Sequence, residues 1–137
     1  MDYGRRRIGL ALSDELHLTA QPLATLARTN RRDDLRRLRE LVRKHGVRQI
    51  VVGHPLRLDG SASEMAAEAE RFAARVEKEL GLPVELVDER LTSWEARETV
   101  AETKPRPGKE RSLDEIAAAV ILRDYLERER VRRAAKG

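Results

Sequence analysis

The chain has 137 residues, a formal net charge of +4 from 28 lysine and arginine against 24 aspartate and glutamate residues, and no cysteine. This length predicts one domain over residues 1–137, and the lack of cysteine excludes disulfides and thiolate metal sites. No apolar run is long enough to span a membrane and no signal-peptide pattern is present, so we expect a cytoplasmic protein without membrane contact.

The first half of the chain predicts two strands, a helix and a third strand. Residues 8–12 are a short apolar run typical of a strand, and residues 23–26 predict a weaker one. Apolar residues recur on one stripe over 33–45 and Gly46 follows them, which is typical of a helix that ends there. Residues 49–52 consist of Gln49 and the continuous apolar run Ile50-Val51-Val52, which predicts a strand buried on both faces.

In the second half, three serine or threonine residues stand three positions before a glutamate, the spacing of a helix capping box. These pairs are Ser61 with Glu64, Thr92 with Glu95, and Ser112 with Glu115. The first predicts a helix that ends at Gly81, the second a short helix, and the third a helix that runs to about Arg130. Residues 84–87 predict a strand, and residues 104–109, with two prolines and a glycine, predict a loop.

This order of elements predicts an α/β layered domain with a mixed sheet. Crossovers through helices leave successive strands parallel, so the loop 53–60 and the pair 88–89 are expected at the same carboxyl edge of the sheet. In open α/β sheets, that edge is where sites form.

Asp114 is the first candidate site residue, because it heads an apolar stripe of the last predicted helix. The other members of this stripe are Ala118, Ile121 and Tyr125. An acid on a face that packs on a sheet needs a partner, and a metal ion would be one. The alternative is that the helix dipole favours an acid in the first turn.

Two further acids could join Asp114. Only one of Asp88 and Glu89 can face the site, since successive strand residues point to opposite faces, and the pattern does not choose between them. These acids could ligate a metal or pair with Arg90. Asp2 is the third candidate, with a frayed chain end as its alternative. Three converging carboxylates are what a metal-dependent nuclease needs.

The charge and the aromatic content indicate how a partner would be bound. The basic balance favours a polyanion. Aromatic residues are limited to Tyr3, Phe72, Trp94 and Tyr125. A platform for stacked bases normally uses several aromatic rings, so we expect contact with nucleic acid through its phosphate backbone.

Four ordered motifs resemble those of the YqgF (RuvX) family over essentially the whole chain. They are DYGRRRIGLALSD at 2–14, VVGHPL at 51–56 with Asp59-Gly60, DERLTSWEA at 88–96, and Lys109 with LDEIAAAVILRDYL at 113–126. The resemblance implies a ribonuclease H-like mixed five-stranded sheet flanked by helices. Family members carry apolar residues before the first motif, where this chain has only Met1, so we expect a truncated first strand and a native start upstream.

The resemblance also implies a function, a metal-dependent nuclease in 5′-end maturation of pre-16S ribosomal RNA. Carried over, Asp2, Glu89 and Asp114 are the catalytic residues and the ligands of Mg²⁺ or Mn²⁺, in a site expected to hold two ions. The residues expected to bind the substrate backbone are Arg5, Arg6, Arg7, Arg90 and Lys109.

Two alternatives stay open. A Holliday-junction resolvase-like DNA endonuclease for recombination and repair shares the fold and chemistry but needs two active sites, hence a symmetric dimer. A nucleic-acid-binding protein without hydrolytic activity is the other. The partner is thus pre-16S rRNA or structured DNA, and we expect a monomer or a weak homodimer.

Overall fold

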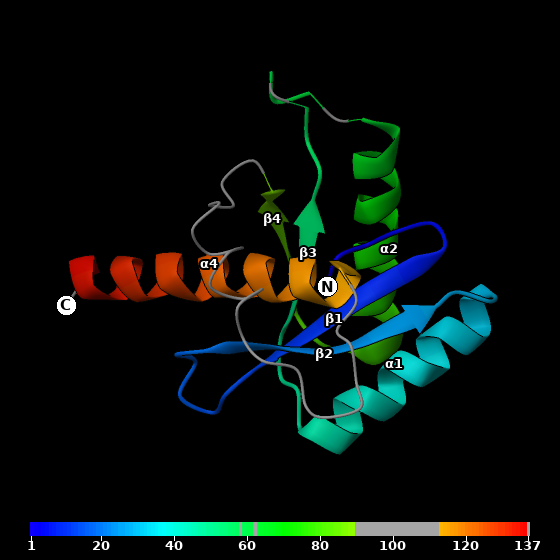
Figure 1. Cartoon of the computed structure of the whole chain (residues 1–137), viewed down its shortest axis with the longest axis horizontal. Helices are drawn as coiled ribbons and strands as arrows, with labels where there is room; N and C mark the ends of the chain where they lie inside the picture. The colour runs from blue at the N-terminus through cyan, green and yellow to red at the C-terminus, as the bar shows by residue number, and fades with distance from the viewer. Residues whose placement is uncertain (58, 62, 90–112, 137) are drawn as a thin grey trace.

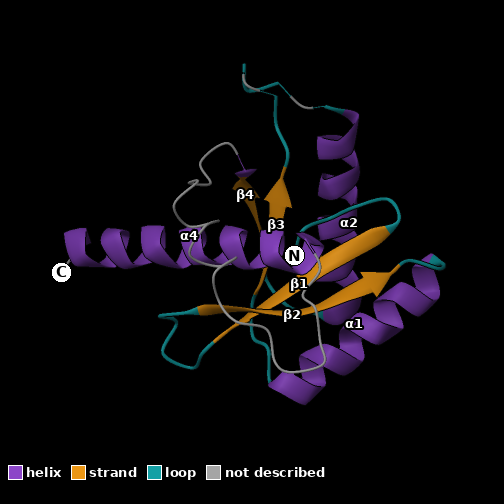
Figure 2. Cartoon of the chain, in the orientation of Figure 1, coloured by secondary structure: helices purple, strands orange, loops and turns teal. Residues whose placement is uncertain are grey.

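The structure is a computed structural model that describes residues 1–57, 59–61, 63–89 and 113–136. Four strands and three helices lie in this part of the chain (Figures 1 and 2). They are β1 (Arg7–Ser13), β2 (Ala20–Ala27), α1 (Arg31–His45), β3 (Ile50–His54), α2 (Glu64–Leu80), β4 (Val84–Asp88) and α4 (Leu113–Lys136). The predicted short helix after Thr92 and the predicted loop 104–109 lie outside the described residues.

The strands form two pairs that the N-terminus joins. β1 and β2 are antiparallel, and β3 and β4 are parallel, so the predicted mixed character is confirmed. Between the pairs, Asp2 exchanges backbone hydrogen bonds of 2.9 and 3.0 Å with Gly9 of β1. On the other side, the Met1 carbonyl accepts from the Gly53 amide of β3 at 3.0 Å, and the Met1 amino group donates to the Val51 carbonyl at 2.6 Å.

The predicted count of five strands is not confirmed. Within the described residues, the place between β1 and β3 is filled by Met1 and Asp2 alone, which form an isolated bridge and no strand. Two residues are too few for a ladder, because only two of their backbone groups reach each neighbouring strand.

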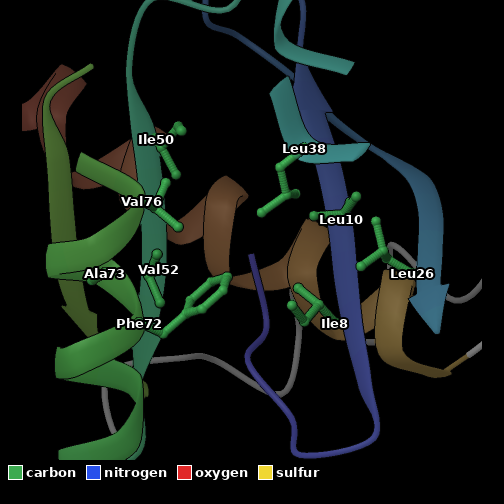
Figure 3. Close-up of a cluster of buried hydrophobic side chains, with 9 residues drawn as sticks. All are labelled: Ile8, Leu10, Leu26, Leu38, Ile50, Val52, Phe72, Ala73 and Val76. Carbon is green, nitrogen blue, oxygen red and sulfur yellow. The ribbon is translucent and has the colours of Figure 1, made fainter. Parts of the chain in front are cut away.

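Helices cover both faces of the sheet. On one face, side chains from β1, β2 and β3 meet α1 and α2 in a buried core (Figure 3). Its members are Ile8, Leu10, Leu26, Leu38, Ile50, Val52, Phe72, Ala73 and Val76. Burying each large apolar side chain contributes about 1.5–3 kcal/mol. Of the described helices, none has the length and apolar character needed to cross a membrane.

α4 packs on the opposite face. Val51, between the two core residues Ile50 and Val52, points to this side and contacts Ile121, as the alternation of strand side chains requires. Ala118 and Ile121 are 0% and 4% exposed, which confirms that the predicted apolar stripe of this helix packs on the sheet.

The predicted starts of α1 and α2 were each wrong by two residues. α1 begins at Arg31 and not at Asp33, because the Asn30 side chain accepts the Asp33 amide at 2.9 Å and is the N-cap. In α2 the N-cap is Ser63 in place of Ser61, with its hydroxyl accepting the Ala66 amide at 3.1 Å.

Candidate active site

Asp2 enters the sheet directly opposite Gly9, so its side chain projects from the face to which a Cβ atom on Gly9 would point. Tyr3 projects from the other face, where its ring centroid lies 5.1 Å from that of Phe72 on α2. The carboxylate of Asp2 therefore belongs to the face that α4 covers.

Gly9 brings the first turn of α4 into contact with β1. A Cβ atom on Gly9 would meet the backbone carbonyl oxygen of Asp114 and would lie 3.0 Å from the Glu115 nitrogen. Both are backbone atoms, so any side chain at this position would push α4 away from the sheet. The missing side chain thus places Asp114 beside the backbone pair of Asp2 and Gly9.

Gly53 likewise allows the Glu89 side chain to lie close to the backbone of β3. A Cβ atom on Gly53 would meet the carboxylate oxygen Oε1 of Glu89 and would lie 2.8 Å from Cδ1 of Ile121 on α4. The Glu89 side chain therefore folds back over β3 on the face that α4 covers. The sequence pattern left Asp88 and Glu89 equivalent, and the geometry puts Glu89 on the same face as Asp2.

The Met1 amino group lies in the field of two of these carboxylates. Burial lowers its pKa from 8.0 to about 6, while the carboxylates of Asp2 and Glu89 act in the opposite direction and raise it. Asp2 and Glu89 therefore lie close enough to one buried group to act on it electrostatically.

The carboxylate of Asp114 is engaged by an arginine. Arg7 Nε lies 2.9 Å from Asp114 Oδ2, and the two side chains are 63% and 31% exposed. Carboxylate oxygens are the donors that Mg²⁺ and Mn²⁺ prefer, so the chemistry of the three acids fits such an ion. Across the described ranges, however, no three acidic or histidine side chains are grouped so that they could hold a metal. In this arrangement the carboxylate of Asp114 is paired with Arg7 and is not grouped with two further acids of the described ranges.

The predicted substrate-binding residues divide into three groups. Arg5 and Arg7 make ion pairs, Arg5 with Glu68 at 2.9 Å. Arg6 is exposed, and its guanidinium forms no ion pair with any residue that the structure describes. Arg90 and Lys109 lie outside the described residues.

The two glycines are the site residues that the sequence analysis missed. Gly9 stands inside a predicted strand and Gly53 directly after one. A glycine within a strand pattern often marks a close approach of another segment, so the signal was present. That signal does not say which segment approaches. In both cases the structure shows a proposed catalytic acid from a distant part of the chain.

A family model and known proteins match this chain over nearly its whole length. Residues 1–128 match the model of the family described as RuvX, Holliday junction resolvase. A protein of Koribacter versatilis named "Putative pre-16S rRNA nuclease" is 47% identical over 129 residues, which cover 93% of this chain and 84% of that protein. A protein of Geobacillus kaustophilus with the same name is 44% identical over 133 residues, covering 95% and 96%.

Solved structures resemble the fold. Thermus thermophilus RuvC, in complex with a Holliday junction substrate, superposes with a TM-score of 0.58 and 16% identity, covering 94% of this chain and 92% of RuvC. A second structure of the same RuvC gives a TM-score of 0.57 at 15% identity. This likeness concerns the fold alone, and it confirms the predicted α/β, ribonuclease H-like class.

Proposed function

Because the chain belongs to the RuvX family, we propose that it is a nuclease that hydrolyses phosphodiester bonds in the precursor of 16S ribosomal RNA. The substrate follows from the names of relatives that are 47% and 44% identical to it. The structural observation that carries the proposal is the pair of glycines, Gly9 and Gly53, that seat Asp114 and Glu89 on either side of Asp2.

Asp2, Glu89 and Asp114 would hold Mg²⁺ or Mn²⁺, which when bound supplies an activated water and neutralises charge on the phosphoryl oxygens. The sheet holds two members of this set on one face, since the backbone of Asp2 pairs with Gly9 and the Glu89 carboxylate lies against Gly53. Asp114 completes the set by turning from Arg7 toward Asp2.

Arg7 has a second role in this scheme. A guanidinium binds phosphate oxygens in the same forked geometry that it uses for a carboxylate. When Asp114 turns away, the Arg7 guanidinium at the start of β1 is left without its acid and can take a phosphate oxygen of the substrate. Substrate binding and completion of the acidic set are then one exchange of partners.

A second candidate function is cleavage of structured DNA, as in a junction resolvase. The family's description as a Holliday junction resolvase favours this function, and so does the fold shared with RuvC. The two functions use the same acids on different substrates. A resolvase acts on both strands of a junction through a symmetric dimer, so its oligomeric state and substrate preference separate the two candidates.

The test is cleavage of matched pre-16S rRNA, single-stranded RNA and four-way DNA junction substrates with Mn²⁺. We expect cleavage of the pre-rRNA, inhibition by a chelator, and loss of cleavage in Asp114→Asn with the fold retained. Asp33→Asn is the matched control, because Asp33 is also an acid in the first turn of a helix and pairs with an arginine, Arg36.

Three results would count against the proposal. Full activity of Asp114→Asn removes this residue from the site, and cleavage in the presence of chelator removes the metal from the reaction. Preferred cutting of the four-way junction by a dimer supports the resolvase instead.

A further inference from the structure

A pocket of about 480 Å³ lies outside the acidic site, between the N-terminal loop, the start of α1 and α2. Figure 1 shows these three segments on one side of the molecule. Five arginines and two acids line this pocket, which we term the arginine pocket, so its positive charges exceed its negative charges by three. The arginines are Arg5, Arg28, Arg31, Arg71 and Arg75.

Two of these arginines are part of the protein's own structure. The Arg28 Nε lies 3.3 Å from Oδ2 of Asp34, whose side chain is 3% exposed, and its Nη1 donates to the Tyr3 hydroxyl at 3.0 Å. Arg5 is held by Glu68 at 2.9 Å. These pairs use both acids of the arginine pocket.

The other three arginines are left as free positive charge. Arg31, Arg71 and Arg75 form no ion pair within the part of the chain that the structure describes. Arg71 and Arg75 are four residues apart on α2 and therefore share a face. Arg31 is the first residue of α1, where the helix dipole disfavours a cation. Three like charges in such places repel one another, and a bound anion would relieve that repulsion.

The walls of the arginine pocket indicate the kind of anion. Phe72 is 5% exposed, and its ring centroid lies 5.1 Å from that of Tyr3. The Arg28 guanidinium lies over both rings, 5.1 Å from the Tyr3 centroid and 5.8 Å from the Phe72 centroid. The guanidinium thus occupies one face of each ring, where a base would otherwise stack. Guanidinium groups match phosphate oxygens in geometry and charge. The lining therefore favours a phosphate group over a stacked base as the ligand.

One short segment links the arginine pocket to the acidic site. The Asp2 side chain lies on the face that α4 covers, while the next residue, Tyr3, lines the arginine pocket on the opposite face. The exposed Arg6 lies in the loop between Tyr3 and β1. A nucleic-acid strand that passes over this loop would contact both places.

We propose that the arginine pocket binds a backbone phosphate of the nucleic acid, away from the bond that the acids would cut. This inference rests on the proposed nuclease function and extends its substrate contact to the face formed by α1 and α2. The contact reads phosphate and not sequence, so it contributes affinity for any strand that reaches it.

The test compares two double variants that remove the same number of positive charges. Arg71→Ala/Arg75→Ala empties the arginine pocket of two free charges, and alanine is the best helix former at both positions of α2. Arg43→Ala/Lys44→Ala is the control, in the last turn of α1, at the opposite end of that helix from Arg31. Thermal unfolding of both variants checks that each is folded.

Binding is measured by fluorescence anisotropy with a labelled RNA duplex and a labelled single strand, in chelator to prevent cleavage, from roughly 50 to 200 mM salt. We expect the arginine-pocket variant to bind roughly tenfold more weakly than the wild type. The slope of log Kd against log salt should fall by about 1.4 on the single strand and about 1.8 on the duplex, for two lost phosphate contacts. Equal effects of the two double variants would reduce the result to net charge and overturn the proposal.

A second arm separates the nucleic-acid backbone from a free phosphate compound. Inorganic phosphate and a mononucleotide are added as competitors at constant ionic strength. Mononucleotide binding that is lost in Arg71→Ala/Arg75→Ala, with unchanged RNA affinity, would assign the arginine pocket to a free nucleotide. The two proposals fail separately: a wild type that binds RNA and never cuts it refutes the nuclease, whereas equal binding by both double variants refutes only the pocket.

Discussion

Arg7 Nε of β1 and Asp114 Oδ2 of α4 lie 2.9 Å apart, so an exposed ion pair holds one of the three proposed catalytic acids. Exposed pairs of this kind contribute only about 0.2–1 kcal/mol to stability. The pair can therefore be exchanged for a metal and a phosphate at little cost.

The first prediction concerns this exchange. Arg7→Ala removes the competitor of the metal, so we expect Mn²⁺ to bind severalfold more tightly and stability to change by less than about 1 kcal/mol. The substrate KM should rise because a phosphate contact is lost. Titration calorimetry with Mn²⁺ and steady-state cleavage measure the two effects.

Arg132→Ala is the matched control, since Arg132 is also 63% exposed and pairs with Glu129 at 2.9 Å. It should change neither Mn²⁺ affinity nor KM. Weaker Mn²⁺ binding by Arg7→Ala would contradict the exchange of partners.

The second prediction concerns Gly9. In Gly9→Ala the new methyl group meets backbone atoms of Asp114 and Glu115, which cannot turn aside, so α4 must shift. We expect a loss of about 1–3 kcal/mol in the free energy of unfolding, measured with urea, together with loss of cleavage.

Gly81→Ala separates this effect from ordinary glycine substitution. Gly81 has φ +68° and no atom near its Cβ position, so the cost is conformational, about 1–2 kcal/mol, and cleavage should persist. Full cleavage by Gly9→Ala would show that contact with β1 does not position Asp114.

The third prediction concerns Gly53, where the new methyl group meets the ends of two flexible side chains, those of Glu89 and Ile121. These can move, so Gly53→Ala should cost less stability than Gly9→Ala. Displacement of the Glu89 carboxylate should still weaken Mn²⁺ binding and cleavage. Urea unfolding compares the stabilities of the two variants, and Mn²⁺ titration compares their metal affinities. A larger stability loss in Gly53→Ala than in Gly9→Ala would contradict the prediction.

The fourth prediction concerns pH. The pKa of the Met1 amino group is about 6 in the folded chain against 8.0 as its ordinary value. Between these values the unfolded chain binds more protons, so the free energy of unfolding should rise from pH 6 to pH 8, by about 2 to 3 kcal/mol from this group. The penalty is complete below the folded pKa and absent above the unfolded one.

Urea unfolding over this pH range measures the slope for the chain with a free Met1 amino group and for the same chain acetylated there. Acetylation removes the titrating group and keeps an N–H donor for Val51. Any other titrating group contributes equally to both chains. The same slope in both would show that the amino group is not buried as described.

Local patterns in the sequence predicted the elements well, because strand and helix periodicity depends on neighbouring residues. The runs at 49–52 and 84–87 became β3 and β4 within two residues at each end. The start of α2 was wrong for a tertiary reason. Ser63 caps α2 while its hydroxyl also donates to the Pro55 carbonyl at 3.0 Å, a contact that no spacing rule contains.

The acidic site was predictable in part. The stripe headed by Asp114 gave the correct face of α4, because helical phase is a local property. The place of Glu89 depends on Gly53 and Ile121, which lie 36 and 32 residues away from it in the chain. The pairing of Asp114 with Arg7 could likewise not be predicted from local sequence patterns, since it joins opposite ends of the chain.

The joining of two strand pairs by Met1 and Asp2 has a consequence for cooperativity. The β1–β2 hairpin and the β3–β4 pair each keep their own ladder, so the opening that breaks fewest sheet hydrogen bonds is separation of one pair from the other. That motion would carry Gly9 and Gly53 apart and dismantle the acidic site before either half unfolds. Amide hydrogen exchange at these two glycines would then follow the lifetime of the assembled site, a quantity distinct from global stability.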